Sequence, residues 1–77
     1  NPLLEWVEVD ADSPIAGKTL GETDLRAETG ASVVVIERDD DVITSPGGET
    51  TIQAGDTLVV VGTREDCDAF ESRVAAE

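Results

Sequence analysis

The sequence predicts a single small α+β domain in which helices cover a sheet. Short runs rich in valine, isoleucine and leucine, separated by turns rich in glycine and acidic residues, are typical of strands. Two other stretches contain threonines suited to cap a helix. At 77 residues the chain has room for one core only. The segment order is strand, helix, hairpin, strand, helix, so we expect a β-α-β-β-β-α domain with a mixed sheet and two helices.

The first half of the chain contains a strand followed by a short helical region. Apolar and acidic side chains nearly alternate along residues 4–9, which predicts a strand with one face partly exposed to solvent. Thr19 and Glu22 have the spacing of a capping box, so a helix is expected to begin there. Residues 25–29 add one or two further turns, which end at Gly30, a natural left-handed residue.

The second half contains a hairpin, the last strand and the second helix. Residues 31–37 are apolar and β-branched, which favours a strand buried on both faces. Residues 41–44 are expected to return beside it, because so brief a connection permits only a hairpin. After a proline- and glycine-rich loop, residues 57–62 form a second fully apolar strand. A helix capped by Thr63 is expected to run to about Ala75.

Charge and composition argue against several kinds of partner. The net charge is -13, and the five basic residues are scattered, so nucleic acid and anionic membrane surfaces are poor partners. No signal peptide or membrane span is found, so we expect a cytoplasmic location without direct membrane insertion. The acid excess predicts a halophilic source, because the Debye length falls from about 8 Å at physiological salt to about 3 Å at molar salt.

The chain offers little for catalysis or metal binding. It has no histidine, which removes the usual general base and a common metal ligand. Cys67 shares one apolar helix stripe with Phe70 and Val74, and one cysteine is too few for a structural zinc site. The run from Asp39 to Asp41 lacks the alternation of a calcium loop and is expected to form a solvated turn. We therefore expect no enzyme activity, no metal and no cofactor.

One junction is a candidate binding site. Arg26 precedes the helix end at Gly30, where a sharp turn exposes backbone amides that an anion can use together with a guanidinium. Ser32 adds a hydroxyl nearby. The alternative is that Arg26 is a solvated helix charge paired with Glu22 one turn away. The later proline-glycine loop lacks the Gly-Lys-Ser/Thr ending of a phosphate loop, although Pro46 can form the wall of a shallow pocket.

Four sequence blocks lie in order with suitable gaps and cover nearly the whole chain. They are SPIAGKTL at 13–20, RAETG at 26–30, VVVIER at 33–38 and AGDTLVVVGT at 54–63. Together they resemble the C-terminal domain of RCK proteins, also called the TrkA-C domain, and residues 1–77 are interpreted as one such domain. The resemblance implies a homodimeric regulatory domain of a potassium channel, a potassium uptake system or a cation/proton antiporter. The parent chain would link it to that membrane protein.

The resemblance also implies a ligand. Some family members bind cyclic di-AMP in the dimer interface, through the arginine before the glycine turn, the residues after that glycine and a proline of the following loop. Carried over by position, the candidate ligand-binding residues are Leu25, Arg26, Ala31, Ser32, Val33 and Pro46. Members that bind the ligand often have asparagine at the position of Ser32 and an aromatic residue at that of Thr29.

Two other functions compete with this one, and only the first of them stays open. In the first, the domain is a ligand-free dimerisation scaffold of a larger transport-associated or regulatory protein. In the second, it is a swinging-arm carrier, because residues 54–58 resemble a turn of biotinyl and lipoyl domains. Those domains present a modified lysine at a hairpin tip, whereas Lys18, the one lysine of this chain, precedes a helix. Titration with cyclic di-AMP separates a sensor from a scaffold.

Overall fold

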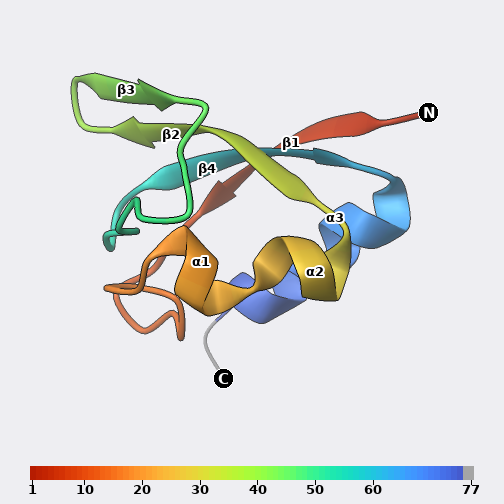
Figure 1. Cartoon of the computed structure of the whole chain (residues 1–77), viewed down its shortest axis with the longest axis horizontal. Coiled ribbons are helices and arrows are strands. Elements are labelled where there is room, and N and C mark those ends of the chain that lie inside the picture. The colour runs from red at the N-terminus through yellow and green to blue at the C-terminus, as the bar shows by residue number, and fades with distance from the viewer. Residues whose placement is uncertain (76–77) are drawn as a thin grey trace.

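The computed structural model describes residues 1–75 and contains one sheet with its helices on one face (Figure 1). The elements are β1 (Leu3–Glu8), α1 (Leu20–Thr23), α2 (Leu25–Thr29), β2 (Ser32–Arg38), β3 (Asp41–Thr44), β4 (Thr57–Gly62) and α3 (Arg64–Val74). The α+β class and the predicted element order are confirmed, with the first helical region divided in two. Within residues 1–75, every helix is too short or too polar to span a bilayer.

The four strands form one antiparallel sheet in the order β1-β4-β2-β3. Every neighbouring pair in it is antiparallel, so the expectation of a mixed sheet is wrong. β1 and β2 do run in the same direction, because both are antiparallel to β4. However, β4 lies between them and pairs with each. A mixed sheet needs at least one parallel pair of neighbouring strands. Here β1 and β2 are not neighbours, and each pairs with β4 in the antiparallel direction.

The first helical region breaks at Asp24, between α1 and α2. The predicted capping box is present, because the Thr19 hydroxyl accepts a hydrogen bond from the Glu22 amide at 3.2 Å and the Glu22 carboxylate accepts one from the Thr19 amide at 2.8 Å. Asp24 has a left-handed φ of 55°, and α2 ends at Gly30 with a φ of 87°. A left-handed backbone conformation destabilises a residue that has a Cβ by roughly 1–2 kcal/mol. Asp24 carries this strain, whereas Gly30 has no Cβ and does not.

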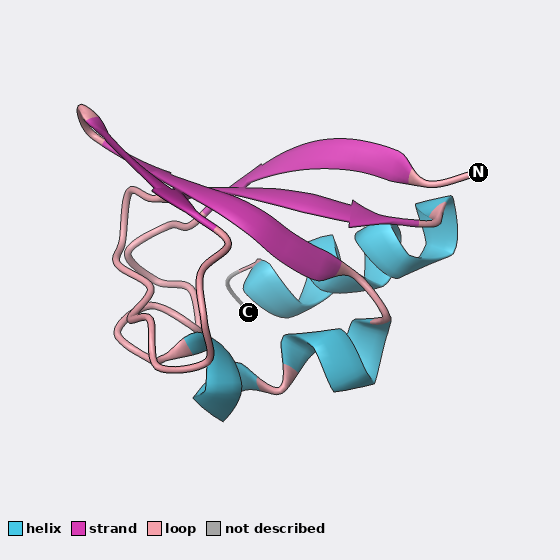
Figure 2. Ribbon diagram, turned by 45° about the horizontal axis from the view of Figure 1, so that its top comes forward, coloured by secondary structure: helices cyan, strands magenta, loops and turns pink. Residues whose placement is uncertain are grey.

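The core lies between one face of the sheet and the helix layer (Figure 2). Phe70 is fully buried on α3 beside Cys67 and Val74, which confirms the stripe predicted from their spacing. Burying a side chain of this size contributes roughly 1.5–3 kcal/mol. The strands contribute the buried core residues Val7, Ile36, Leu58 and Val60.

The opposite face of the sheet carries no helix within the described residues (Figure 1, Figure 2). The prediction that residues 31–37 form a strand buried on both faces is therefore wrong for the single chain. Within β2, Ile36 is buried and its apolar neighbours on the uncovered side are half-exposed. An apolar β-branched run predicts burial on both sides, but burial of the second face needs a partner that residues 1–75 do not supply.

Candidate functional site

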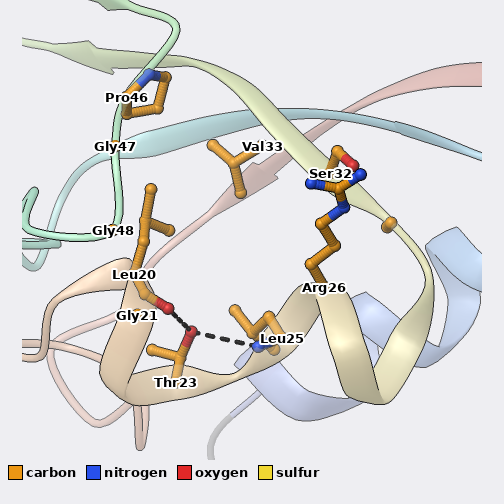
Figure 3. A pocket seen from close by; sticks show the side chains of 11 residues that line it. Leu20, Gly21, Thr23, Leu25, Arg26, Ser32, Val33, Pro46, Gly47 and Gly48 are labelled. Atoms are coloured by element: carbon orange, nitrogen blue, oxygen red, sulfur yellow. Dashed lines mark hydrogen bonds between the residues drawn. The ribbon is translucent and has the colours of Figure 1, made fainter.

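A pocket of about 290 Å³ lies between α1, α2, the start of β2 and the loop after β3 (Figure 3). It brings together every residue that sequence reasoning proposed for the site. These are Leu25 and Arg26 of α2, Ala31, Ser32 and Val33 after the glycine turn, and Pro46 of the loop. The remaining lining residues, which sequence reasoning did not assign to a site, are Leu20, Gly21, Thr23, Gly47 and Gly48.

Arg26 is the one charged residue among the described residues that line the pocket. Its side chain extends from α2 toward Ser32 at the start of β2 (Figure 3). The ion pairs within residues 1–75 involve other arginines, so the alternative pairing of Arg26 with Glu22 is not seen. The carboxylate of Glu22 binds the amide and hydroxyl of Thr19 instead, and these hydrogen bonds lower the pKa of Glu22. The Arg26 guanidinium is thus available to an anion.

The start of β2 presents an open strand edge beside the pocket. β4 pairs with β2 from Ser32 onward, whereas β3 pairs with β2 only from Val35. On the open side, the carbonyl oxygen of Val34 accepts a hydrogen bond from the Ser45 amide at 3.0 Å. A register shift between Val33 and Val35 marks a bulge at this point. An open edge offers backbone hydrogen-bonding groups to a ligand or to another strand.

The proline-glycine loop forms the opposite wall and is held against α1. The Gly21 amide donates to the Gly48 carbonyl oxygen at 2.8 Å, and the Leu20 amide donates to that of Thr50 at 2.9 Å. Glycine suits this position, because a Cβ on Gly21 would lie 3.1 Å from the Gly48 oxygen and would push the loop away by a few tenths of an ångström. From the sequence, Pro46 of this loop was expected to form the wall of a shallow pocket, and it does line the pocket. The contact with α1, far away in the sequence, is what makes the loop a pocket wall.

Most of the remaining lining is apolar. Leu25 is buried at the base, and Leu20, Val33 and Pro46 are half-buried around it. The Thr23 hydroxyl is engaged locally, because it donates to the Leu20 carbonyl oxygen at 2.6 Å and accepts from the Leu25 amide at 3.3 Å (Figure 3). A guanidinium, a strand edge and an apolar base suit a ligand that combines an anionic group with a flat apolar part, as a nucleotide does.

Comparison with known proteins identifies the domain. The family model of the TrkA-C domain matches residues 4–75. The chain belongs to the TrkA-C family. This TrkA-C domain is 43% identical over 68 residues to the Ktr system potassium uptake protein C of Bacillus subtilis, covering 88% of the chain and 31% of that protein. It is 33% identical over 64 residues to the K(+)/H(+) antiporter subunit KhtT of the same organism, covering 82% of the chain and 39% of that subunit.

The chain therefore spans about a third of the length of these two curated relatives. A solved structure of nearly the same extent is the RCK_C domain dimer of S. agalactiae BusR in complex with c-di-AMP. The two chains are 31% identical and superpose with a TM-score of 0.86, covering 92% of this TrkA-C domain and 93% of the BusR chain. Almost every part of that BusR domain thus has a counterpart in the fold described above.

Thr29 has a structural role in this TrkA-C domain and is not among the described residues that line the pocket. Its side chain is buried, and its hydroxyl donates to the Leu25 carbonyl oxygen at 2.7 Å and accepts from the Ala31 amide at 3.2 Å. These bonds close the turn around Gly30. Of Thr29 and Ser32, the two positions singled out by the resemblance, only Ser32 lines the pocket.

Proposed function

We propose that this TrkA-C domain is a regulatory ligand-binding and dimerisation domain of a potassium channel, a potassium uptake system or a cation/proton antiporter, and that it senses cyclic di-AMP. The observation that carries the proposal is the meeting of Arg26, an open strand edge and an apolar base in one pocket. The family and its relatives support the transport context, since they include a potassium uptake protein and an antiporter subunit. The BusR complex supports the choice of ligand.

The chemistry of cyclic di-AMP complements that of the pocket. Arg26 binds a phosphate through charge-assisted hydrogen bonds. The apolar side chains of Val33 and Pro46 contact a face of an adenine, and Ser32 with the adjacent strand edge binds the polar rim of the same base. The ligand consists of two identical halves. A pocket of about 290 Å³ takes one half, so two copies of the chain each contribute a pocket to one ligand.

The charge of the protein makes this binding dependent on salt. A net charge of -13 repels a dianion at low ionic strength. The described lining of the pocket includes no carboxylate, so the repulsion comes from more distant groups. Salt screens distant charges more effectively than a direct contact with Arg26. Binding is therefore strongest near molar KCl.

Regulation follows from the shared ligand. A ligand that contacts both protomers favours the dimer geometry in which both pockets meet it, and shifts the population toward that geometry by its differential affinity. The parent chain carries this shift to the linked transporter or channel. By reciprocity, any state of the transporter that favours the same dimer geometry tightens ligand binding.

Calorimetric titration of cyclic di-AMP at molar KCl tests the proposal. Wild type should bind one ligand per two chains, and Arg26→Ala should bind at least about tenfold more weakly, because a charge-assisted hydrogen bond is lost. Arg64→Ala is the matched control, since it removes an exposed arginine at the start of α3, away from the pocket. No heat with wild type would end the ligand hypothesis and favour the ligand-free scaffold. Equal losses in both variants would trace the effect to net charge.

A further inference from the structure

One wall of the pocket is a loop without a buried side chain. Residues 46–48 lie across the pocket from Val33, which belongs to the start of β2 (Figure 3). No residue from 45 to 51 is buried, and the first buried side chain after the loop is that of Ile52. Apolar packing stabilises the position of a segment through the side chains that it buries. The position of this wall therefore depends on hydrogen bonds.

The loop is hydrogen-bonded to the start of α1. The Leu20 amide donates to the Thr50 carbonyl oxygen at 2.9 Å. The Gly21 amide donates to the Gly48 carbonyl oxygen at 2.8 Å. Amides in the first turn of a helix have no acceptor within that helix, so the loop supplies one to each. Because α1 contains no buried residue either, the loop and α1 form one hydrogen-bonded unit without a fully buried side chain.

Two further hydrogen bonds connect the loop to β2, one at each end of the loop. At the near end, the Ser45 amide donates to the Val34 carbonyl oxygen at 3.0 Å. At the far end, Nη2 of Arg38 donates to the Thr51 carbonyl oxygen at 2.9 Å. The first residues of β2 form the facing wall of the pocket. The same strand therefore forms one wall with its start and holds the other wall from its end.

The guanidinium of Arg38 is itself held in place by Asp56. Its Nε and Nη2 donate to the two oxygens of this carboxylate, which is 1% exposed. The planar guanidinium presents its N–H groups in a fixed fork, so the bidentate contact also fixes the direction of the Nη2 hydrogen that reaches Thr51. Arg38 is not among the described residues that line the pocket. It thus acts on the pocket wall from outside the pocket.

We infer that Arg38 is a positioning residue of the ligand pocket, which fixes the distance between the loop wall and the start of β2. Losing the bond to Thr51 removes the connection between β2 and the far end of the loop, while the bond at Ser45 stays. Pro46 then no longer keeps a constant distance from Val33. A ligand must order such a wall when it binds, and this ordering lowers its affinity. The inference rests on the proposed function for the ligand, and adds the residue that shapes its pocket.

Arg38→Lys is the variant that tests this role. An ammonium keeps the charge beside Asp56 but cannot reproduce the fork that also reaches Thr51. The variant therefore removes the connection to the wall without leaving the buried carboxylate unpaired. Arg64→Lys is the matched control, because Arg64 is exposed at the start of α3 and does not line the pocket.

Native-state hydrogen exchange, followed by NMR at molar KCl, measures the position of the wall without a ligand. In Arg38→Lys, the amides of Leu20 and Gly21 should exchange about tenfold faster than in wild type, relative to the buried Val60 amide of β4. The Gln53 amide donates to the Asp56 carboxylate, and its exchange relative to Val60 should not change. Arg64→Lys should match wild type at all four amides.

Calorimetric titration with cyclic di-AMP measures the consequence for binding. Arg38→Lys should bind about tenfold more weakly than wild type, since the wall must be ordered on binding. Arg64→Lys should bind as wild type does. If wild type binds no cyclic di-AMP, the proposed function fails, and the exchange of Leu20 and Gly21 still decides whether Arg38 positions the wall.

Three results would overturn the inference. The first is wild-type exchange of Leu20 and Gly21 in Arg38→Lys. The second is an equal acceleration of every amide, because Arg38 would then act on global stability alone. The third is wild-type affinity for cyclic di-AMP in a variant with accelerated exchange. If Arg38→Lys fails to fold, Arg38→Met combined with Asp56→Asn replaces it with the same expected outcomes, because the double variant leaves no buried charge unpaired.

Discussion

The guanidinium of Arg38 binds the carboxylate of Asp56 through two hydrogen bonds, with Nε 2.9 Å from Oδ1 and Nη2 2.8 Å from Oδ2. Asp56 is 1% exposed and also accepts the Gln53 amide at 2.9 Å. Arg38 Nη2 donates further to the Thr51 carbonyl oxygen at 2.9 Å. The pair therefore connects the end of β2 to the segment that runs from the pocket wall into β4. Its bidentate geometry is the strong form of an arginine–carboxylate contact.

Removing the charge of Asp56 should destabilise the fold in a pH-dependent way. Burial raises the pKa of this carboxyl, but hydrogen bonds from Arg38 and the Gln53 amide outweigh burial, and the pKa ends below its ordinary value. A carboxyl with a lowered folded-state pKa stabilises the fold above its unfolded pKa of about 3.9, and this contribution is lost as the pH falls through the folded pKa. Asp56→Asn should lower the free energy of unfolding by roughly 1.5–3 kcal/mol at neutral pH, because it breaks a charge-assisted contact whose carboxylate is buried while Arg38 is partly exposed.

Urea unfolding at several pH values measures this effect. The difference between wild type and Asp56→Asn should shrink below about pH 4, as Asp56 becomes protonated. Asp12→Asn, which removes the same charge from an exposed loop residue, should show no comparable loss. A difference that stays constant with pH would show that Asp56 acts through packing and not through its charge.

Gly30 should be intolerant of a side chain for two separable reasons. Its φ is 87°, and a Cβ there would lie 2.8 Å from Oδ1 of Asp66, the carboxylate whose Oδ2 accepts a hydrogen bond from the Thr63 amide at the start of α3. Gly30→Ala should cost about 2–3 kcal/mol, combining left-handed strain with a disturbed helix cap. Gly55→Ala is the control, since its φ is 93° with nothing within 4 Å, and it should cost only about 1–2 kcal/mol. Equal losses in urea unfolding would mean that Asp66 moves aside freely.

Neutralising Glu71 should stabilise the protein at neutral pH. A hydrogen bond with the carboxyl of Glu5, followed by burial and the charge of Glu5, raises the pKa of Glu71. A carboxyl with a raised folded-state pKa destabilises the fold while ionised, and this cost is relieved as the pH falls through the folded pKa. Glu71→Gln should therefore raise Tm at neutral pH and lose this advantage in acid. Scanning calorimetry with Glu65→Gln as the charge-matched control checks it, and equal gains would indicate net charge alone.

Salt should stabilise the domain. With a net charge of -13, like charges repel across the surface, and the Debye length falls from about 30 Å at low ionic strength to about 3 Å at molar salt. Tm should rise by several degrees between dilute buffer and molar KCl, and equally in NaCl if screening is the cause. An unchanged Tm would refute the proposed adaptation to high salt.

Local sequence was sufficient where the interacting residues are neighbours along the chain. The cap formed by Thr19 and Glu22, the left-handed turn at Gly30 and the buried stripe through Cys67 and Phe70 depend on residues within one or two helical turns. Spacing alone encodes such contacts. The arginine before a glycine turn also made Arg26 and Ser32 candidates for a site, and the resemblance to the TrkA-C family added Leu25, Ala31 and Val33.

Tertiary structure decided the features that depend on distant segments. The antiparallel sheet arises because β4 lies between β1 and β2, and the contact of Arg38 with Asp56 joins residues 18 positions apart. The loop after β3 forms one wall of the pocket because the Gly21 amide of α1 donates a hydrogen bond to the Gly48 carbonyl oxygen. Which apolar side chains remain uncovered also depends on the register of all four strands. Backbone hydrogen bonds of this kind can form between any two segments that meet, because they do not depend on the side chains. The sequence therefore determines which segments form strands. Which strands pair with one another is decided by the packing of the whole chain.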